Sequence, residues 1–402
     1  MTTKKGVWDI QDLRDKSLQS LWSYSSEADP GQLWAIGYNG WGQLAQNNRT
    51  DYSSPVQIGS ESTWSIIKMS WSHQAGIKTD GTLWIWGQNR FGKLGLNESG
   101  NPIPSNPYSR SSPTQIPGTT WANVSCNEQS TFGIKTDGTL WGWGTEGNWG
   151  SPGGSPAGHR SSPTQIGTGE TWATGKGKLA SWTDTGAAIN TSGELFTWGR
   201  NYTGSLGQNQ SQPVKYSQND PAQVGSDTDW DILGGVNDQG WSGFLALKTN
   251  GTLWTCGDNT YGTLAQNDRT HRSSPVQIPG TTWSKEFTGK DDDYRLAIKT
   301  DGTMWTWGEN NFGQLAQNDR TSRSSPVQVG SGTDWSTVCN AQGFVMAQKT
   351  DGTMWSWGYN GFGALGQNNK TNYSSPVQIP GTNWNSASGN IAYQTLSSLR
   401  FA

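Results

Sequence analysis

An all-β protein that closes into a ring of seven four-stranded blades, a β-propeller, is the fold class that the sequence predicts. Three markers support it, each present seven times in the 402 residues at spacings of 49 to 58 residues. One marker is the glycine that ends a Leu-Trp-x-Trp-Gly type of block, at Gly37, Gly87, Gly144, Gly199, Gly257, Gly308 and Gly358. The others are the proline of a Ser-Ser-Pro-Val-Gln type of block, at Pro55, Pro113, Pro163, Pro221, Pro275, Pro326 and Pro376, and the tryptophan that follows it, at Trp64, Trp121, Trp172, Trp230, Trp283, Trp335 and Trp384.

Each repeat divides into four short strands without helical periodicity. The segments 64–69 and 75–78 are two of them, and the Thr-Asp-Gly and Thr-Asn-Gly turns between apolar runs are typical of hairpins. In the block LWIWG, Trp84 and Trp86 are two residues apart and therefore share one strand face. The segment SPVQI is the last strand, with Pro55 at its first position, where no N–H is needed. One blade cannot bury both faces alone, so the paired tryptophans are expected to pack against the neighbouring blade.

The two ends of the repeat region complement each other. The first block, QLWAIG at 32–37, lacks the two strands that should precede it, and Trp384 is followed only by NIAYQ and a degenerate SSLRFA. We expect the C-terminal strands to complete the blade that the N-terminal strands begin, which removes two exposed sheet edges. The propeller domain then covers residues 31–402.

Residues 1–30 have no counterpart in the repeats and form a separate segment. Ile10, Leu13, Leu18, Leu21 and Trp22 recur there at roughly helical spacing. The residues predicted to form the anchor contacts are Trp8, Ile10, Leu13, Leu21 and Trp22. The segment is predicted to be a short helical anchor. A helix that caps the ring is the alternative.

The composition excludes several classes of protein. The net charge is −3 and the chain has no basic run, so no nucleic-acid partner is expected. No stretch reaches 18 apolar residues, so no membrane insertion is expected, and the N-terminus lacks the apolar run of a secretory signal. Cys126, Cys256 and Cys339 are too far apart for a disulfide framework or a CxxC metal site and are expected to be small buried strand residues.

No catalytic motif of the HExxH, GxSxG or P-loop type is present. The run KDDDYR at 290–295 lacks the spacing of a calcium loop and is interpreted as a solvated acidic turn. The recurring Lys-Thr-Asp-Gly turns, such as Lys78 and Asp80, are interpreted as solvated turn surface. We therefore expect no enzyme activity, no cofactor and no metal site.

The block W…AIKTDGTLWxWGxNxxGQLG…SSPVQI resembles the repeats of the regulator of chromosome condensation family, over residues 32 to about 396. This resemblance implies a seven-bladed propeller. The founding member exchanges nucleotide on a nuclear GTPase and binds chromatin, but only His73 matches the histidine that often precedes the inner strand in that family. The sequence has no wedge of alternating runs and no basic arm, so the resemblance implies a binding platform.

The segment GVWDIQDLRDKSLQSLWSY resembles the N-terminal segments of virion structural proteins, including tail-fibre-type proteins of phages of marine bacteria. This resemblance implies attachment to other virion proteins through residues 1–30.

The loops that differ between repeats indicate where binding occurs. If each blade is an up-and-down meander, the turns that carry Trp71, Trp182 and Trp241 lie at the same end of the ring as the loops between LWxWG and SSP. Those loops are expanded in the second, third and fourth repeats, where they carry Tyr108, Trp149 and Tyr216. Aromatic side chains there can stack on sugars or anchor a protein. Neutral loop drift is the alternative for any one of these residues.

The sequence thus favours a non-enzymatic binding protein in the virion, tail-fibre-like or decorating, that displays a propeller toward a host-surface glycan or protein. The alternative is a cytoplasmic interaction scaffold or exchange-factor-like propeller. The oligomeric state is left open.

Overall fold

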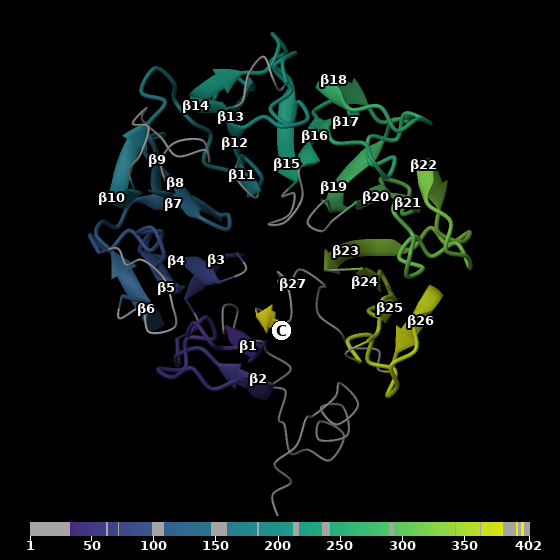
Figure 1. The fold of residues 1–402 in the computed structure, drawn as a ribbon, viewed down its shortest axis with the longest axis horizontal. Helices are drawn as coiled ribbons and strands as arrows, with labels where there is room; N and C mark the ends of the chain where they lie inside the picture. Colours follow the sequence, from purple (N-terminus) through teal and green to yellow (C-terminus); the bar gives the residue numbers. More distant parts are fainter. Residues whose placement is uncertain are drawn as a thin grey trace, which may run out of the picture.

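The structure is a computed structural model and describes residues 33–61, 63–70, 72–98, 108–145, 159–182, 185–211, 217–234, 242–288, 293–341, 343–361, 363–380, 391–392 and 395–397. These residues form strands, turns and loops without a helix, which confirms the all-β prediction. Figure 1 shows the sheets arranged around a ring, with one strand of each sheet nearest the centre. The predicted N-terminal anchor, residues 1–30, lies outside the described residues.

Six sheets each consist of four consecutive, antiparallel strands, as the four-strand repeat predicts. We name each blade by its first and last strand. The strands are β3 (Trp64–Met69), β4 (His73–Lys78), β5 (Leu83–Gly87) and β6 (Arg110–Ile116); β7 (Trp121–Cys126), β8 (Ser130–Lys135), β9 (Leu140–Thr145) and β10 (His159–Ile166); β11 (Leu179–Trp182), β12 (Thr185–Ile189), β13 (Leu195–Arg200) and β14 (Ser217–Gln223); β15 (Trp230–Gly234), β16 (Ser242–Lys248), β17 (Leu253–Gly257) and β18 (Arg272–Gln277); β19 (Trp283–Thr288), β20 (Tyr294–Lys299), β21 (Met304–Gly308) and β22 (Arg323–Gln328); β23 (Trp335–Ala341), β24 (Phe344–Lys349), β25 (Met354–Gly358) and β26 (Tyr373–Ile379).

A further four-stranded sheet joins the two ends of the chain, in the order β2-β1-β28-β27. It contains β1 (Trp34–Gly37), β2 (Tyr52–Gln57), β27 (Ile391–Ala392) and β28 (Thr395–Ser397). Strand β1 pairs antiparallel with β28, so that Ala35 lies opposite Ser397 and Gly37 opposite Thr395. The pairing expected between the N- and C-terminal strands is therefore present, while Leu399 and Phe401 lie outside the described residues.

The second tryptophan of the Leu-Trp-x-Trp-Gly block packs between blades, as predicted. Trp86 and Trp307 are fully buried, and each indole N–H donates to a carbonyl of the preceding blade, Gln43 at 2.9 Å and Thr263 at 2.8 Å. Where Cys256 replaces this tryptophan, its buried Sγ lies 3.4 Å from the equivalent carbonyl of Ser205. Each indole therefore both fills the core and joins two blades.

The glycine of this block is required by the close approach of two strands. Gly308 has a φ of 103°, a region that L side chains rarely adopt. A Cβ at this position would lie 2.2 Å from the backbone oxygen of Asp293. The marker glycine is therefore a backbone requirement of the fold.

The lysine of the Lys-Thr-Asp-Gly turn is buried, which corrects the interpretation of this turn as solvated surface. Lys78 is 8% exposed, and its Nζ lies 5.1 Å from the ring centre of Trp64 and 4.0 Å from that of Trp84. A desolvated ammonium between two indole faces gains cation–π attraction while its aliphatic stem packs. Thr79 and Asp80 of this turn are exposed, and the Oδ1 atom of Asp80 accepts a hydrogen bond from the Thr82 N–H at 3.0 Å. An ammonium group lies near two indole rings in the same way at Lys135, Lys248, Lys299 and Lys349. Of these four lysines, Lys248 is buried and the others are half-buried.

Candidate interaction surface

The meander places two kinds of connection at opposite ends of the ring. Turns between the first and second strands and loops between the third and fourth strands lie at one end, which we call the loop face. The Lys-Thr-Asp-Gly turns between the second and third strands lie at the other end, the turn face. The sequence predicted that the variable loops and the repeated turns lie at opposite ends of the ring. The six blades that are built from consecutive strands have this arrangement.

Six loops of the loop face contain a buried asparagine two residues after the marker glycine. Asn310 is fully buried, its Oδ1 accepts from the Leu315 N–H at 2.9 Å, and its Nδ2 donates to the Asp319 carbonyl at 3.1 Å. Five of these loops are also joined to the next blade, as in the Asn318 N–H that donates to the Ser374 carbonyl at 2.7 Å. The equivalent buried residues are Asn39, Asn89, Asn201, Asn259 and Asn360. Among the described residues, the backbone of these loops is therefore held by hydrogen bonds.

Two of the six predicted binding residues fall within the described residues. Tyr108 is 39% exposed and lies on the loop face just before β6, as expected for a contact residue. Trp71, Trp149, Trp241 and Tyr216 lie outside the described residues, as do the anchor residues Trp8, Ile10, Leu13, Leu21 and Trp22.

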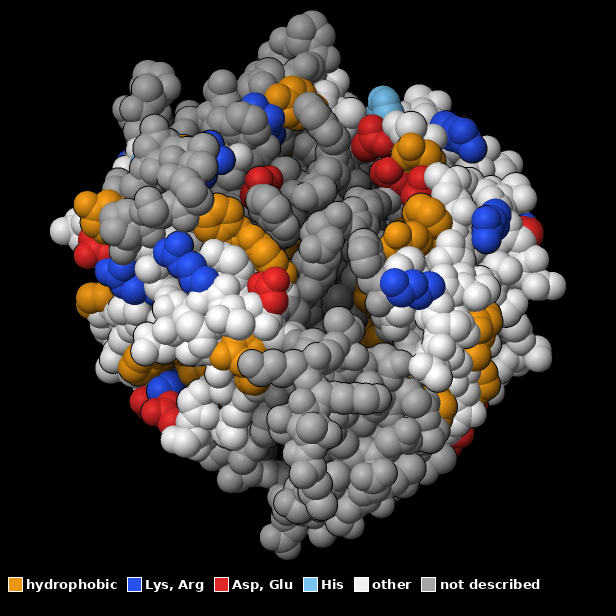
Figure 2. Space-filling model, turned by 60° about the horizontal axis from the view of Figure 1, so that its bottom comes forward, with side chains coloured by type: hydrophobic (Ala, Val, Ile, Leu, Met, Phe, Trp, Pro, Cys, Tyr) orange, Lys and Arg blue, Asp and Glu red, His pale blue; other side chains and the backbone are white. Residues whose placement is uncertain are grey.

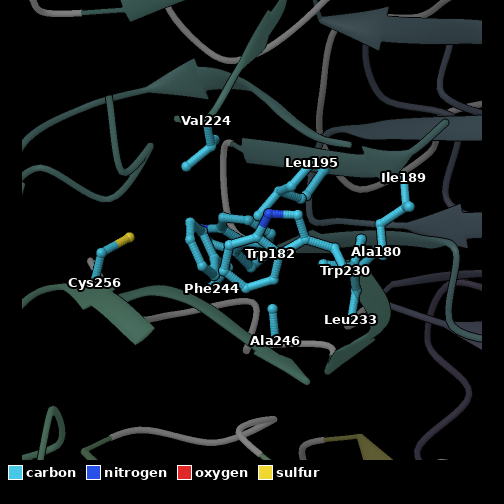
Figure 3. Packing of buried hydrophobic residues seen from close by; sticks show 11 residues of the cluster. Ala180, Trp182, Ile189, Leu195, Val224, Trp230, Leu233, Phe244, Ala246 and Cys256 are labelled. Carbon is cyan, nitrogen blue, oxygen red and sulfur yellow. The ribbon is translucent and has the colours of Figure 1, made fainter. Parts of the chain in front are cut away.

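Trp182 is the exception, because it is 2% exposed and ends strand β11. Its backbone pairs with Thr185, and its side chain belongs to a core cluster with Trp230 and Phe244 of the next blade. Figure 3 shows the indole among these side chains, in the cluster that also holds Cys256. The prediction that Trp182 lies in an exposed turn is wrong, since the ring fills space between two blades.

Two exposed aromatic side chains on the loop face, Tyr38 and Phe312, were missed by the sequence reasoning. Within the described residues, the exposed large hydrophobic side chains are Tyr38 at 41%, Tyr108 at 39% and Phe312 at 38%. Tyr38 precedes the buried asparagine of its loop, and Phe312 follows the equivalent asparagine by two positions. An aromatic residue recurs at that second position, at Trp41, Phe91, Tyr261, Phe312 and Phe362, and this recurrence was the available signal.

A buried lysine joins the loop face of two neighbouring blades. Lys93 is 2% exposed, and its Nζ donates to Ser72 Oγ at 2.7 Å, Gln88 Oε1 at 2.9 Å and the Glu128 carbonyl at 3.0 Å. Ser72 lies in the β3–β4 turn and Glu128 in the β7–β8 turn, so this ammonium group fixes their relative position.

His73 lies beside this lysine in the same interface. It is fully buried, and its Nε2 lies 2.9 Å from Thr131 Oγ1 of the β7–β10 blade. Burial, and then the positive charge of Lys93, hold the pKa of His73 well below its usual value of 6.5. A neutral histidine here holds two blades together, so the one histidine that matches the family pattern has a packing role in this chain.

Carboxylates gather on another part of the loop face. Glu309 N–H donates to the Asp293 carbonyl at 2.6 Å, and His271 Nδ1 lies 3.4 Å from Asp258 Oδ2. Asp293, then Glu309, then burial and Asp258 raise the pKa of Tyr261, because negative charge opposes formation of the phenolate. In Figure 2, acidic, basic and hydrophobic side chains lie side by side around one face.

Among the described residues, no three His, Cys, Asp or Glu side chains gather where a metal ion could bind. None of their segments forms a helix long and apolar enough to span a membrane. Cys126 and Cys256 are buried, whereas Cys339 is half-buried, so the expectation of a buried cysteine fails there.

Comparison with known proteins identifies the repeats. The Regulator of chromosome condensation (RCC1) repeat matches residues 80–134, 301–348 and 351–389, and a second form of that repeat matches residues 238–263. The chain therefore carries RCC1 repeats, as the sequence resemblance predicted.

Curated relatives share these repeats at low identity. The chain is 25% identical over 305 residues to the ultraviolet-B receptor UVR8 of Arabidopsis thaliana, which covers 73% of this chain and 64% of UVR8. It is also 25% identical over 283 residues to the E3 ubiquitin-protein ligase HERC2 of Mus musculus, covering 68% of this chain but 6% of HERC2. The chain thus spans less than two thirds of either relative.

Solved structures show the same fold. Yeast RCC1 (Prp20), in its structure bound to Kap60, superposes with a TM-score of 0.71 at 16% identity, over 94% of this chain and 93% of that one. Human WBSCR16 superposes with a TM-score of 0.70 at 14% identity, over 91% and 98%. The described fold is therefore an RCC1-like propeller.

Proposed function

We propose that this chain is a non-enzymatic protein-interaction propeller that binds its partner through the loop face. One observation carries the proposal: the exposed aromatic side chains Tyr38, Tyr108 and Phe312 all lie on loops of this face. Aromatic side chains supply large contact area at low entropic cost and are enriched where proteins bind each other. The loops that carry them are held by buried asparagines, which lowers the cost of ordering on binding.

Similar proteins support a protein partner. One yeast RCC1 (Prp20) structure holds Kap60, and another is described together with binding to Gsp1p and histones. By analogy, this proposal includes seven blades in one closed ring and a scaffold or exchange-factor-like role. These relatives lend no support to a virion component, which rests on residues 1–30 alone. Attachment through that segment and the location of the protein remain predictions.

The experiment compares two triple variants of the full chain. The loop-face variant carries Tyr38→Ala, Tyr108→Ala and Phe312→Ala, and the control carries Gln115→Ala, Gln277→Ala and Gln378→Ala, which are exposed near the turn face. Both are immobilised and used to capture proteins from an extract of the source organism, after circular dichroism shows that each is folded. We expect a set of proteins that wild type and control retain and the loop-face variant loses. Equal retention by all three would contradict the proposal.

A further inference from the structure

Part of the loop face carries an exposed aromatic pair that spans two blades. Phe312, in the β21–β22 loop, is 38% exposed, and its ring centre lies 4.9 Å from that of Tyr359 in the β25–β26 loop. Gly343, in the β23–β24 turn, approaches the pair so closely that a Cβ there would lie 3.0 Å from the Phe312 ring. The pair thus rests on backbone and turns its remaining surface to solvent.

A carboxylate is fixed beside this pair. Glu309 accepts hydrogen bonds from Asn311 Nδ2 at 2.5 Å and from Gln314 Nε2 at 3.3 Å. The Oε1 atom of Gln314 in turn accepts from the Phe312 N–H at 2.8 Å. One glutamine therefore sets the position of the carboxylate relative to the aromatic ring.

Further carboxylates extend this surface toward the β15–β18 blade. The Glu309 N–H bond to the Asp293 carbonyl brings the β19–β20 turn beside the loop. The negative charges of Asp293, then Glu309, and of Asp258 raise the pKa of Tyr261 in the β17–β18 loop. Arg269 opposes this effect, and His271 Nδ1 lies 3.4 Å from Asp258 Oδ2.

We propose that this surface, made by Phe312, Tyr359, Glu309, Asp293 and Asp258, binds an arginine-rich segment of a partner protein. The inference rests on the proposed function and names the chemistry of the partner. A guanidinium group stacks on an aromatic face and pairs with a carboxylate through two parallel hydrogen bonds. Arginine suits such a site better than lysine, because its planar fork matches both groups.

The turn face does not offer the same chemistry. Its exposed aspartates, such as Asp80, accept from the N–H and hydroxyl of Thr82, two residues later in the same turn. The tryptophan faces there already hold the buried lysines of the turns. Charge complementarity for a basic segment therefore favours the loop face.

The test measures binding of two labelled synthetic peptides to the full chain by fluorescence anisotropy. One peptide alternates arginine with serine, and the other alternates glutamate with serine. Phe312→Ala is matched by Gln277→Ala, an exposed side chain near the turn face, and Glu309→Gln is matched by Asp220→Asn, an exposed carboxylate on β14. We expect each surface variant to weaken the arginine peptide about fivefold and each matched control less than about twofold.

Several results would overturn the inference. One is that the wild-type protein does not bind the arginine peptide, and another is that it binds the glutamate peptide equally well. A third is that Glu309→Gln and Asp220→Asn weaken binding of the arginine peptide equally, which would mean that the net charge of the protein alone attracts the peptide. Binding of a neutral oligosaccharide that Phe312→Ala abolishes, without peptide binding, would assign the surface to glycans. If the loop-face triple variant loses its captured proteins but the peptide result is negative, only this inference fails. If instead the triple variant keeps its captured proteins while the arginine peptide binds as expected, the proposed function fails and the arginine-binding surface stands.

Discussion

The two faces of the ring use the same residue types for different purposes. On the turn face, a lysine between two indole rings returns in blade after blade, as at Lys78 and Lys299. On the loop face, charged and aromatic groups change between blades, from buried Lys93 in one to Glu309 and exposed Phe312 in another. A repeated arrangement stabilises every blade alike, whereas a varied one can distinguish a partner.

The largest expected effect is on the scaffold between the faces. Trp307→Ala should lower the free energy of unfolding by about 3–5 kcal/mol, because it empties a fully buried site and removes the hydrogen bond to the Thr263 carbonyl. Chemical denaturation measures this. A change near zero would mean that the indole contributes little to the core and would remove the argument that these tryptophans hold blades together.

The turn face should be sensitive to its buried ammonium groups. Lys78→Met keeps most of the apolar stem but removes the charge between Trp64 and Trp84, and should cost about 2 kcal/mol. Glu61, which pairs with Lys78 from a half-exposed position, provides the control. Glu61→Gln should cost only about 0–1 kcal/mol, because exposed ion pairs are screened by water. Equal costs in thermal or chemical unfolding would assign the effect to the ion pair.

The loop face should give the molecule a pH dependence near neutrality. The pKa of His73 is held well below 6.5, so the unfolded chain takes up a proton there that the folded chain does not. Stability should therefore fall as the pH drops below about 6.5, by up to about 1.4 kcal/mol per pH unit. Denaturation between pH 7 and pH 5 measures the slope, which His73→Gln should reduce. An unchanged slope in that variant would mean that other groups bind the protons.

Sequence patterns predicted the strands and their order better than the surface. Pairs such as Trp84 and Trp86 mark strands through a spacing of two, and the Thr-Asp-Gly turns fix the hairpins, so the meander followed. The burial of Lys78 did not follow, because it depends on two rings that the fold brings together from different strands. Phe312 was overlooked because it lies inside the repeated block, which was interpreted as scaffold.

The placement of Trp182 failed for a specific reason. Residues 173–178 lengthen the inner segment of this blade, so that only an isolated bridge joins Trp172 to Asn190 and the strand proper begins at Leu179. Counting back from the following strand therefore placed Trp182 in a turn, when it ends β11. An insertion in one repeat shifts its residues relative to the other repeats. The sequence spacing alone does not show whether the residues before or after the insertion form the first strand of the blade.

The smallest expected effect compares the two predicted contact residues that the structure describes. Tyr108→Ala should change the free energy of unfolding by less than about 0.5 kcal/mol, since the side chain is 39% exposed on a loop. Trp182→Ala, made in parallel, should cost several kcal/mol because it opens a cavity beside Trp230 and Phe244. If binding to a captured partner falls for Tyr108→Ala while stability stays constant, Tyr108 is a contact. If Trp182→Ala instead unfolds at the same denaturant concentration as wild type, its ring is not part of the core, and the division between scaffold and binding face fails at this blade.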